Sequence, residues 1–230
     1  MVPVNERLFL RFKFYKKGNL SYVSHLDLVR TMNKIIVRTR LPLWYSEGFN
    51  PKPKMVFAAP LSVGTESVCE FMDVRLTERI DPTFAMEAIN RNMPPEMRVT
   101  ECYYPDLKFT DLEWLDYEIT VSSPHVNEEL ANSVRAVLAQ SEIKIEKKTK
   151  SGPAEVDIKP MIGDARVEIS GSEMKIFVRL ASNPSRFLSP ELVVKALRLY
   201  AGLLSDKNLL SESYTVVRTR ALCADTTEFR

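Results

Sequence analysis

Hydrophobic and polar residues follow a regular pattern from the first residues of the chain. Over 8–18 they alternate with a period of two and end at a glycine, which predicts a strand. The alternation places Leu8, Leu10, Phe12 and Phe14 on one face and Phe9, Arg11, Lys13 and Tyr15 on the other. A helix is expected next, because Ser24 is a favoured N-cap residue and Asp27 completes a capping-box arrangement.

The apolar positions of this helix predict its buried side. They are Leu26, Val29, Met32, Ile36 and Val37. The helix is expected to end before Pro42, because a residue that precedes proline is pushed out of the helical region. A loop rich in proline and glycine, YSEGFNPKPK (45–54), follows it.

The remaining pattern completes one unit and then repeats its order of elements. Strands are expected at 55–61, 67–76 and 97–104, with a second helix from Asp81-Pro82 to about Asn92. From 111 onward the predicted helices are 124–140 and 189–204, and the predicted strands are 115–123, 143–150, 154–162, 165–170, 173–182 and 213–223. With one or two extra strands, both halves read strand, helix, strand, strand, helix, strand. We therefore predict an α+β fold of two tandem ferredoxin-like units, 1–110 and 111–230.

Composition excludes several classes of protein. The chain is 45% hydrophobic, enough for a packed core, yet no apolar run approaches the roughly 20 residues of a membrane span. Its cysteines, Cys69, Cys102 and Cys223, lie far apart without CxxC spacing, and there are only two histidines. We expect no disulfide framework, no metal site and no cofactor, since phosphate-binding and dinucleotide-binding glycine loops are also missing. A reduced cytoplasmic protein without a membrane partner is the expectation.

Positive charge is concentrated near the N-terminus. Residues 7–54 hold eleven lysines and arginines but only two acidic residues, an excess of nine, whereas the whole chain carries a net charge of +2. Such asymmetry favours a polyanionic partner, although lysines on strand edges and helix surfaces also serve solubility.

The first helix and the loop after it combine cations with aromatic rings. Arg30, Lys34 and Arg38 recur at a spacing of four, which aligns them in one row, and Arg40 extends it. Such a row suits the repeating phosphates of a nucleic acid, and exposed rings stack on bases. Trp44, Tyr45 and Phe49 are the nearest rings of the loop. The candidate nucleic-acid-binding residues are Arg30, Lys34, Arg38, Tyr45, Asn50, Lys52 and Lys54.

His25 is the candidate catalytic residue. It lies in the first turn of the helix, where the dipole favours a neutral imidazole that can act as a general base, with Tyr45 or Lys52 as partner. The alternative is a histidine that only bonds to nearby backbone. Glu47, followed by Gly48, is expected to form a salt bridge that organises the loop.

Two weaker polar signals occur in the second half. Asp157 and Lys159 are expected on one face of a short strand. Asn183 and Arg186 precede a helix N-terminus, which is a favourable place for an anion.

Several unusual strings resemble those of the radical-SAM-linked domain, a bacterial family of unknown function. They are SHLDL with Arg30, YSEGFNP with Lys54, PL-VG-ES (60–67) and the pair Glu70 and Asp73. VDIKP and RTRAL agree more loosely, so the resemblance extends over nearly the whole chain. The motif positions that it marks are Ser24, His25, Asp27, Glu47, Gly48, Glu70 and Asp73.

The resemblance implies a setting for the protein but no site. Members occur alone or fused to a radical SAM protein with a cobalamin-binding-like region, and they are often encoded near ribonuclease genes. It therefore implies an accessory protein that binds RNA, not DNA, and works with a radical SAM enzyme. The tandem order also resembles CRISPR-repeat RNA endonucleases, although their C-terminal glycine-rich loop is absent here. Two alternatives remain: a metal-independent RNA endonuclease that uses His25, and a protein-interaction module that docks the radical SAM partner.

Overall fold

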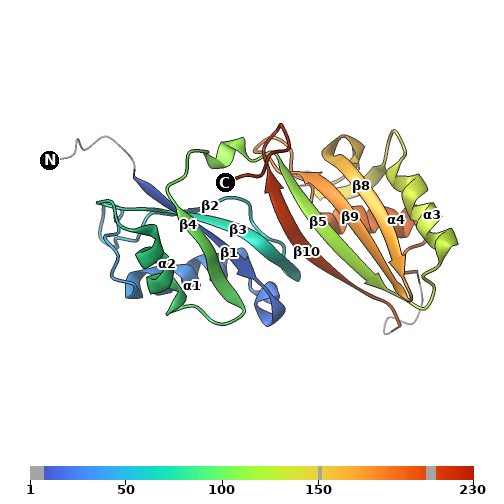
Figure 1. Cartoon of the computed structure of the whole chain (residues 1–230). Coiled ribbons are helices and arrows are strands. Elements are labelled where there is room, and N and C mark those ends of the chain that lie inside the picture. The colour runs from blue at the N-terminus through green and yellow to red at the C-terminus, as the bar shows by residue number, and fades with distance from the viewer. Residues whose placement is uncertain (1–7, 150–151, 206–210) are drawn as a thin grey trace. The chain divides into compact units, whose positions relative to one another are not determined.

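The computed structural model describes residues 8–149, 152–205 and 211–230 (Figure 1). The chain forms two compact units, one ending at Phe109 and the other beginning at Thr110. Both combine an antiparallel sheet with helices, so the protein is of the α+β class. No helix in the part of the chain that the structure describes has the length and apolar character needed to cross a membrane.

The first unit places four strands in one antiparallel sheet in the order β4-β1-β3-β2. Its elements are β1 (Phe9–Lys16), η1 (Gly18–Tyr22), α1 (His25–Arg38), β2 (Met55–Phe57), β3 (Thr65–Arg75), α2 (Pro82–Asn90) and β4 (Met97–Tyr103). β1 and β3 are central, so the sheet reads 4-1-3-2 in the order of its strands along the chain. The predicted strand at 55–61 is much shorter than expected and stops at Phe57.

One face of this sheet carries the core. Leu10, Phe12 and Phe14 on β1 are fully buried in one core with residues of α1 and α2, as their alternation predicts. The predicted apolar stripe of α1 is wrong at two positions, because Leu26 and Val37 are exposed. The residues that α1 buries are Leu28, Met32, Ile35 and Ile36. The helix is rotated relative to the prediction, and it ends at Arg38 because Arg40 adopts a left-handed backbone conformation (φ 57°).

Ser24 fixes the start of α1 as the sequence predicts. Its hydroxyl oxygen accepts a hydrogen bond from the Asp27 amide at 3.2 Å and donates one to the Asp27 carboxylate at 2.8 Å. These bonds, and the Arg30 guanidinium after them, lower the pKa of Asp27. Ser24 and Asp27 therefore have a structural role as the cap of the helix.

The second unit repeats the strand order, β10-β5-β9-β8, which is again 4-1-3-2 within the unit. Its elements are β5 (Trp114–Ser122), α3 (Glu128–Leu138), β6 (Lys144–Thr149), β7 (Gly152–Asp157), η3 (Lys159–Met161), β8 (Ile162–Ser170), β9 (Glu173–Ala181), α4 (Pro190–Ala201) and β10 (Ser213–Leu222), with η2 (Phe109–Asp111) at the boundary of the units. β6 and β7 form a separate hairpin between α3 and β8. α3 begins at Glu128 instead of the predicted 124, because the Asn127 side chain caps it at the Leu130 amide.

Candidate functional site

The outer face of α1 carries the predicted row of cations. Arg30, Lys34 and Arg38 are exposed, as is Arg40 just beyond the helix. Arg30 bonds to Asp27 at 3.1 Å, and the pair is largely exposed to solvent. Among the residues that the structure describes, no acidic group forms an ion pair with Lys34, Arg38 or Arg40. The C-terminal half of the helix thus keeps its positive charge uncompensated.

The loop that follows α1 is folded back on itself. The Ser46 amide donates a hydrogen bond to the Lys52 carbonyl at 2.9 Å, and the Lys54 amide donates one to the Trp44 carbonyl at 3.0 Å. Trp44 packs under the Arg75 guanidinium at 4.2 Å, so its ring is part of the base of the loop. These bonds hold the ends of the loop together and leave its tip in solvent.

The tip presents most of the predicted loop residues. Phe49 is fully exposed and Tyr45 is 41% exposed. Asn50, Lys52 and Lys54 are also exposed, and neither lysine has an ion-pair partner within the described chain. Glu47 is exposed and forms no salt bridge with the described residues, so the structure gives no sign of the predicted organising salt bridge. Gly48 adopts a positive φ of 114°, a conformation that favours glycine at this turn.

We define the basic surface as Lys34, Arg38, Arg40, Lys52 and Lys54, together with the rings of Tyr45 and Phe49. The helical part and the loop part join through the short segment 41–44. The five cations and Phe49 are exposed, and Tyr45 is exposed over 41% of its surface.

His25 lies at the other end of α1. At a rise of 1.5 Å per residue, His25 and Arg38, the first and last residues of α1, are roughly 20 Å apart. The His25 ring packs edge-on against Phe57 with 5.5 Å between centroids. It makes no hydrogen bond to Tyr45, Lys52 or any other residue in the described part of the chain. A catalytic role of His25 therefore stays a prediction, without a hydrogen-bonded partner in the described part of the chain.

Asp73, a motif position, belongs to a buried ion pair. Its carboxylate accepts two hydrogen bonds from the Arg11 guanidinium, at 2.7 and 2.9 Å, and Arg11 is fully buried. Burial raises the pKa of Asp73 more than Arg11 lowers it. Arg11 also donates to the Leu107 carbonyl at 2.9 Å and lies over the Phe109 ring at 4.4 Å. The pair therefore ties residues 107–109 to the sheet face opposite the helices.

A hollow of about 820 Å³ lies beside this pair in the first unit. Its walls come from Phe9, Val56, Arg79, Tyr104 and the segment 105–109, with Asp73 at one side. Glu70, the other acidic motif position of β3, is buried. Both acidic motif residues of this strand are thus part of the interior of the protein.

The two weaker signals of the second half have structural explanations. Asp157 accepts hydrogen bonds from the Ile143 and Lys159 amides, at 2.8 and 3.0 Å, which lower its pKa. Lys159 donates to the last-turn carbonyl of Leu138 in α3 at 2.6 Å. Asn183 and Arg186 both donate to the Glu113 carboxylate, so this acid already occupies the predicted anion position.

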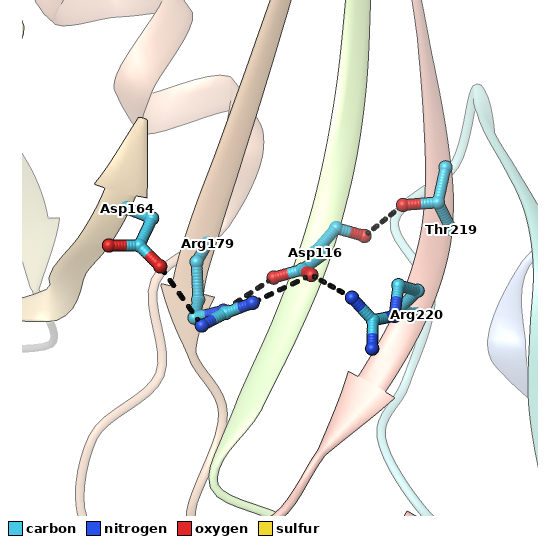
Figure 2. Close-up of polar contacts among 5 residues, drawn as sticks. All are labelled: Asp116, Asp164, Arg179, Thr219 and Arg220. Carbon is cyan, nitrogen blue, oxygen red and sulfur yellow. Dashed lines mark hydrogen bonds and ion pairs between the residues drawn. The ribbon is translucent and has the colours of Figure 1, made fainter. Parts of the chain in front are cut away.

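Sequence reasoning missed a polar cluster on the sheet of the second unit (Figure 2). Asp116 on β5 and Arg179 on β9 are directly paired in register, and the two side chains form hydrogen bonds at 2.7 and 3.1 Å. Asp164 and Arg220 complete the cluster from the flanking strands. The sequence does show charged residues at alternating positions of the predicted strands. Which of them pair with one another can be predicted only when the order of the strands in the sheet is known. No group of three or more possible metal ligands occurs among residues 8–149, 152–205 and 211–230.

Comparison with known proteins identifies a family and no activity. The model of a family described as "Uncharacterized protein conserved in bacteria (DUF2344)" matches residues 10–190. No curated protein matches the chain.

Two similar solved structures show only distant likeness. One, from "Crystal Structure of a Cbf5-Nop10-Gar1 Complex", is 13% identical with a TM-score of 0.47; the match covers 91% of this chain and 49% of that chain, so this chain spans about half of its length. The other, "Crystal Structure of an Unknown Protein from Galdieria sulphuraria", is 12% identical with a TM-score of 0.26 and coverages of 92% and 98%. Neither carries a functional inference.

Proposed function

This chain belongs to the bacterial family DUF2344, and from its surface we propose that it is a non-enzymatic accessory protein that binds RNA. In this proposal RNA lies along the basic surface, and the protein works with a radical SAM enzyme in RNA modification or processing. We interpret the two units, each with a 4-1-3-2 sheet, as tandem ferredoxin-like folds, an architecture that RNA-binding modules also use.

The observation that carries the proposal is the uncompensated charge of the basic surface. Its five cations have no acidic partner among the described residues, whereas other basic side chains such as Lys175 and Arg179 do. Cations that lack acidic partners leave a positive potential on the surface, so a polyanion that neutralises several of them binds favourably and releases its counterions. The exposed rings beside them add surfaces on which unpaired bases stack.

The test is a charge reversal of the basic surface. Arg38→Glu with Lys52→Glu should weaken binding of a short single-stranded oligoribonucleotide at least about tenfold. The slope of log K against log salt should become shallower by roughly 0.7 for each lost phosphate contact. Fluorescence anisotropy over a series of KCl concentrations measures both quantities.

The matched control reverses two exposed arginines elsewhere. Arg91, just after α2, and Arg198 on α4 are exposed, and Arg91→Glu with Arg198→Glu changes the net charge by the same amount. This control should bind with nearly unchanged affinity. Equal weakening in both variants would mean that only net charge matters and would contradict a defined RNA surface.

The radical SAM partner is supported by the sequence resemblance and by a second exposed patch. Three large apolar side chains, Tyr22, Leu26 and Val63, are 71%, 58% and 58% exposed near the start of α1. Tyr22 lies next to Gly64, and the Gly64 amide donates to the Ser21 carbonyl at 2.9 Å, so Tyr22 and Val63 share one region, and Leu26 follows Tyr22 by four residues along the chain. Exposed apolar clusters of this kind are typical of protein interaction sites.

Leu26→Glu should therefore abolish co-purification with a co-expressed radical SAM protein from the same bacterium. Because Leu26 is exposed, the substitution should leave thermal stability nearly unchanged. Leu199→Glu on α4 is the control, since Leu199 is exposed to a similar extent. A complex that survives Leu26→Glu would remove this patch from the docking surface.

A further inference from the structure

A hollow of about 420 Å³ opens on the sheet face of the second unit that lies opposite its helices. Three arginines and two aspartates line it: Arg166, Arg179, Arg220, Asp116 and Asp164. The hollow lies wholly within the second unit and contains no residue of the basic surface.

The Arg179 guanidinium is bound by Asp116 on one side and by the more exposed Asp164 on the other (Figure 2). Its Nε and one terminal nitrogen donate to Asp116, whose side chain is only 19% exposed. The remaining terminal nitrogen donates to Asp164 at 3.1 Å, but that carboxylate is 89% exposed. Exposed ion pairs contribute little, so water or another anion readily replaces Asp164. Asp116 thus positions the guanidinium, and Asp164 acts as an exchangeable acceptor.

Irregularities of the two outer strands shape this hollow. The register of β8 shifts between Ile162 and Ala165, and that of β10 shifts between Arg218 and Arg220. The second shift places Arg220 opposite Asp116, with 3.9 Å between the charged atoms. Bulges of this kind re-aim side chains and occur often beside functional sites.

Gly163 adds to the shape of the hollow, because a side chain there would lie 3.3 Å from the Arg179 stem. The absence of that side chain lets Arg179 lie flat along β8. Thr219 fastens β10 by donating to the Asp116 carbonyl at 3.2 Å.

The charges of the hollow favour an anion. Arg166 lies over the Phe177 ring at 4.0 Å, and its closest acid is Glu168 at 3.5 Å on the same strand. Asp116 is the only acid that the structure holds firmly in place within the hollow. Guanidinium groups bind phosphate oxygens through two parallel hydrogen bonds, which gives phosphate an advantage over a monovalent ion.

We propose that this hollow is a phosphate-binding site, in which a phosphate group replaces Asp164 on Arg179 and is also bound by Arg166, which follows Asp164 by two residues on β8. The phosphate comes either from a free phosphomonoester or from the backbone of an RNA strand. The proposal does not depend on the basic surface and stands or falls separately from it.

Isothermal titration calorimetry of the full chain tests the site with three probes: inorganic phosphate, adenosine 5′-monophosphate and the dinucleoside monophosphate ApA. Arg166→Gln should weaken binding about tenfold. Asp164→Asn should strengthen it several-fold, because it removes the competing carboxylate, and a purely structural ion pair predicts no such gain. Arg166 is chosen over Arg179 because Arg179 also links β5 to β8.

The controls separate this site from the basic surface. Lys175→Gln alters a partly exposed ion pair with Glu118 that lies on β9 and β5 outside the hollow, and it should leave all affinities unchanged. Arg38→Glu with Lys52→Glu should also leave them unchanged. Tighter binding of adenosine 5′-monophosphate than of ApA identifies a free monoester as the ligand, and the reverse identifies an RNA backbone. Absence of binding by all three probes, or no gain in Asp164→Asn, overturns the proposal.

Discussion

Replacing Arg11 with methionine is expected to lower the free energy of unfolding of the first unit by about 3–5 kcal/mol. The substitution leaves the Asp73 carboxylate buried without the two hydrogen bonds that Arg11 donates to it. It also removes the bond to Leu107 and the contact with Phe109 that hold residues 107–109 on the sheet.

Urea denaturation followed by tryptophan fluorescence measures this loss. The chain has two tryptophans, Trp44 in the first unit and Trp114 in the second. In a Trp114→Phe background, Trp44 alone reports the unfolding of the first unit. The matched control is Arg91→Met, which breaks the exposed pair with Glu87 and should cost less than about 1 kcal/mol.

The loss of folding free energy caused by Arg11→Met should also increase as the pH rises. Burial already raises the pKa of Asp73, and loss of the guanidinium raises it further. A folded-state pKa above the unfolded value means that the folded protein binds the proton more tightly, so stability falls as pH rises through that range. Arg11→Met should therefore lower the free energy of unfolding more at pH 8 than at pH 5. A loss of stability that is larger at pH 5 than at pH 8 would contradict the role of Arg11 as the partner of a buried Asp73 carboxylate.

A double variant separates loss of the pair from loss of packing. Arg11→Met with Asp73→Leu removes both charges, and it should be more stable than Arg11→Met alone because no carboxylate is left unpaired. If the double variant loses as much as the two single variants together, the two charges are not coupled.

The order of elements could be predicted from alternation and helical spacing, because both patterns depend only on nearby residues. Phe12 and Phe14 were placed correctly in this way. The exposure of Leu26 and Val37 could not be foreseen from the sequence. An apolar residue beside the buried stripe also fits the helical spacing, and only the packing of α1 on the sheet determines which apolar residues are buried.

The polar sites depended on contacts between distant residues. Arg11 looked like a solvent-facing residue of a strand, and its burial results from the segment 107–109, which lies far along the chain. Asp116 and Arg179 are 63 residues apart and meet only because β5 and β9 are neighbours in register. The basic row of α1 needed no such knowledge, because residues four apart on a helix always lie on one side.

Phe49→Ala is expected to weaken binding of single-stranded RNA by roughly 5- to 150-fold, the equivalent of about 1–3 kcal/mol for one stacked base. The ring is fully exposed at the tip of the loop, next to Lys52 and the other cations of the basic surface. Because it buries no area in the folded chain, its removal should leave the urea midpoint unchanged. Anisotropy titrations of the variant, with its unfolding curve beside them, measure both effects.

The salt dependence distinguishes stacking from charge. Phe49→Ala removes no phosphate contact, so the slope of log K against log salt should stay as in the unmodified protein, whereas Arg38→Glu with Lys52→Glu makes it shallower. Phe84→Ala is the control, because Phe84 is an exposed phenylalanine on α2 and should not affect RNA affinity. Phe49→Trp should retain binding, since an indole ring stacks as well.

Duplex RNA gives the decisive comparison for Phe49. In a duplex the bases are already stacked on one another and offer no free face, so Phe49→Ala should bind it like the unmodified protein while the charge-reversed variant still binds it weakly. A similar loss on duplex and single strands would show that the loop recognises the backbone and not the bases. Unchanged affinity for both RNAs would mean that the exposed Phe49 ring contacts a protein partner. The loop would then belong to the surface that binds this partner and not to the RNA-binding surface.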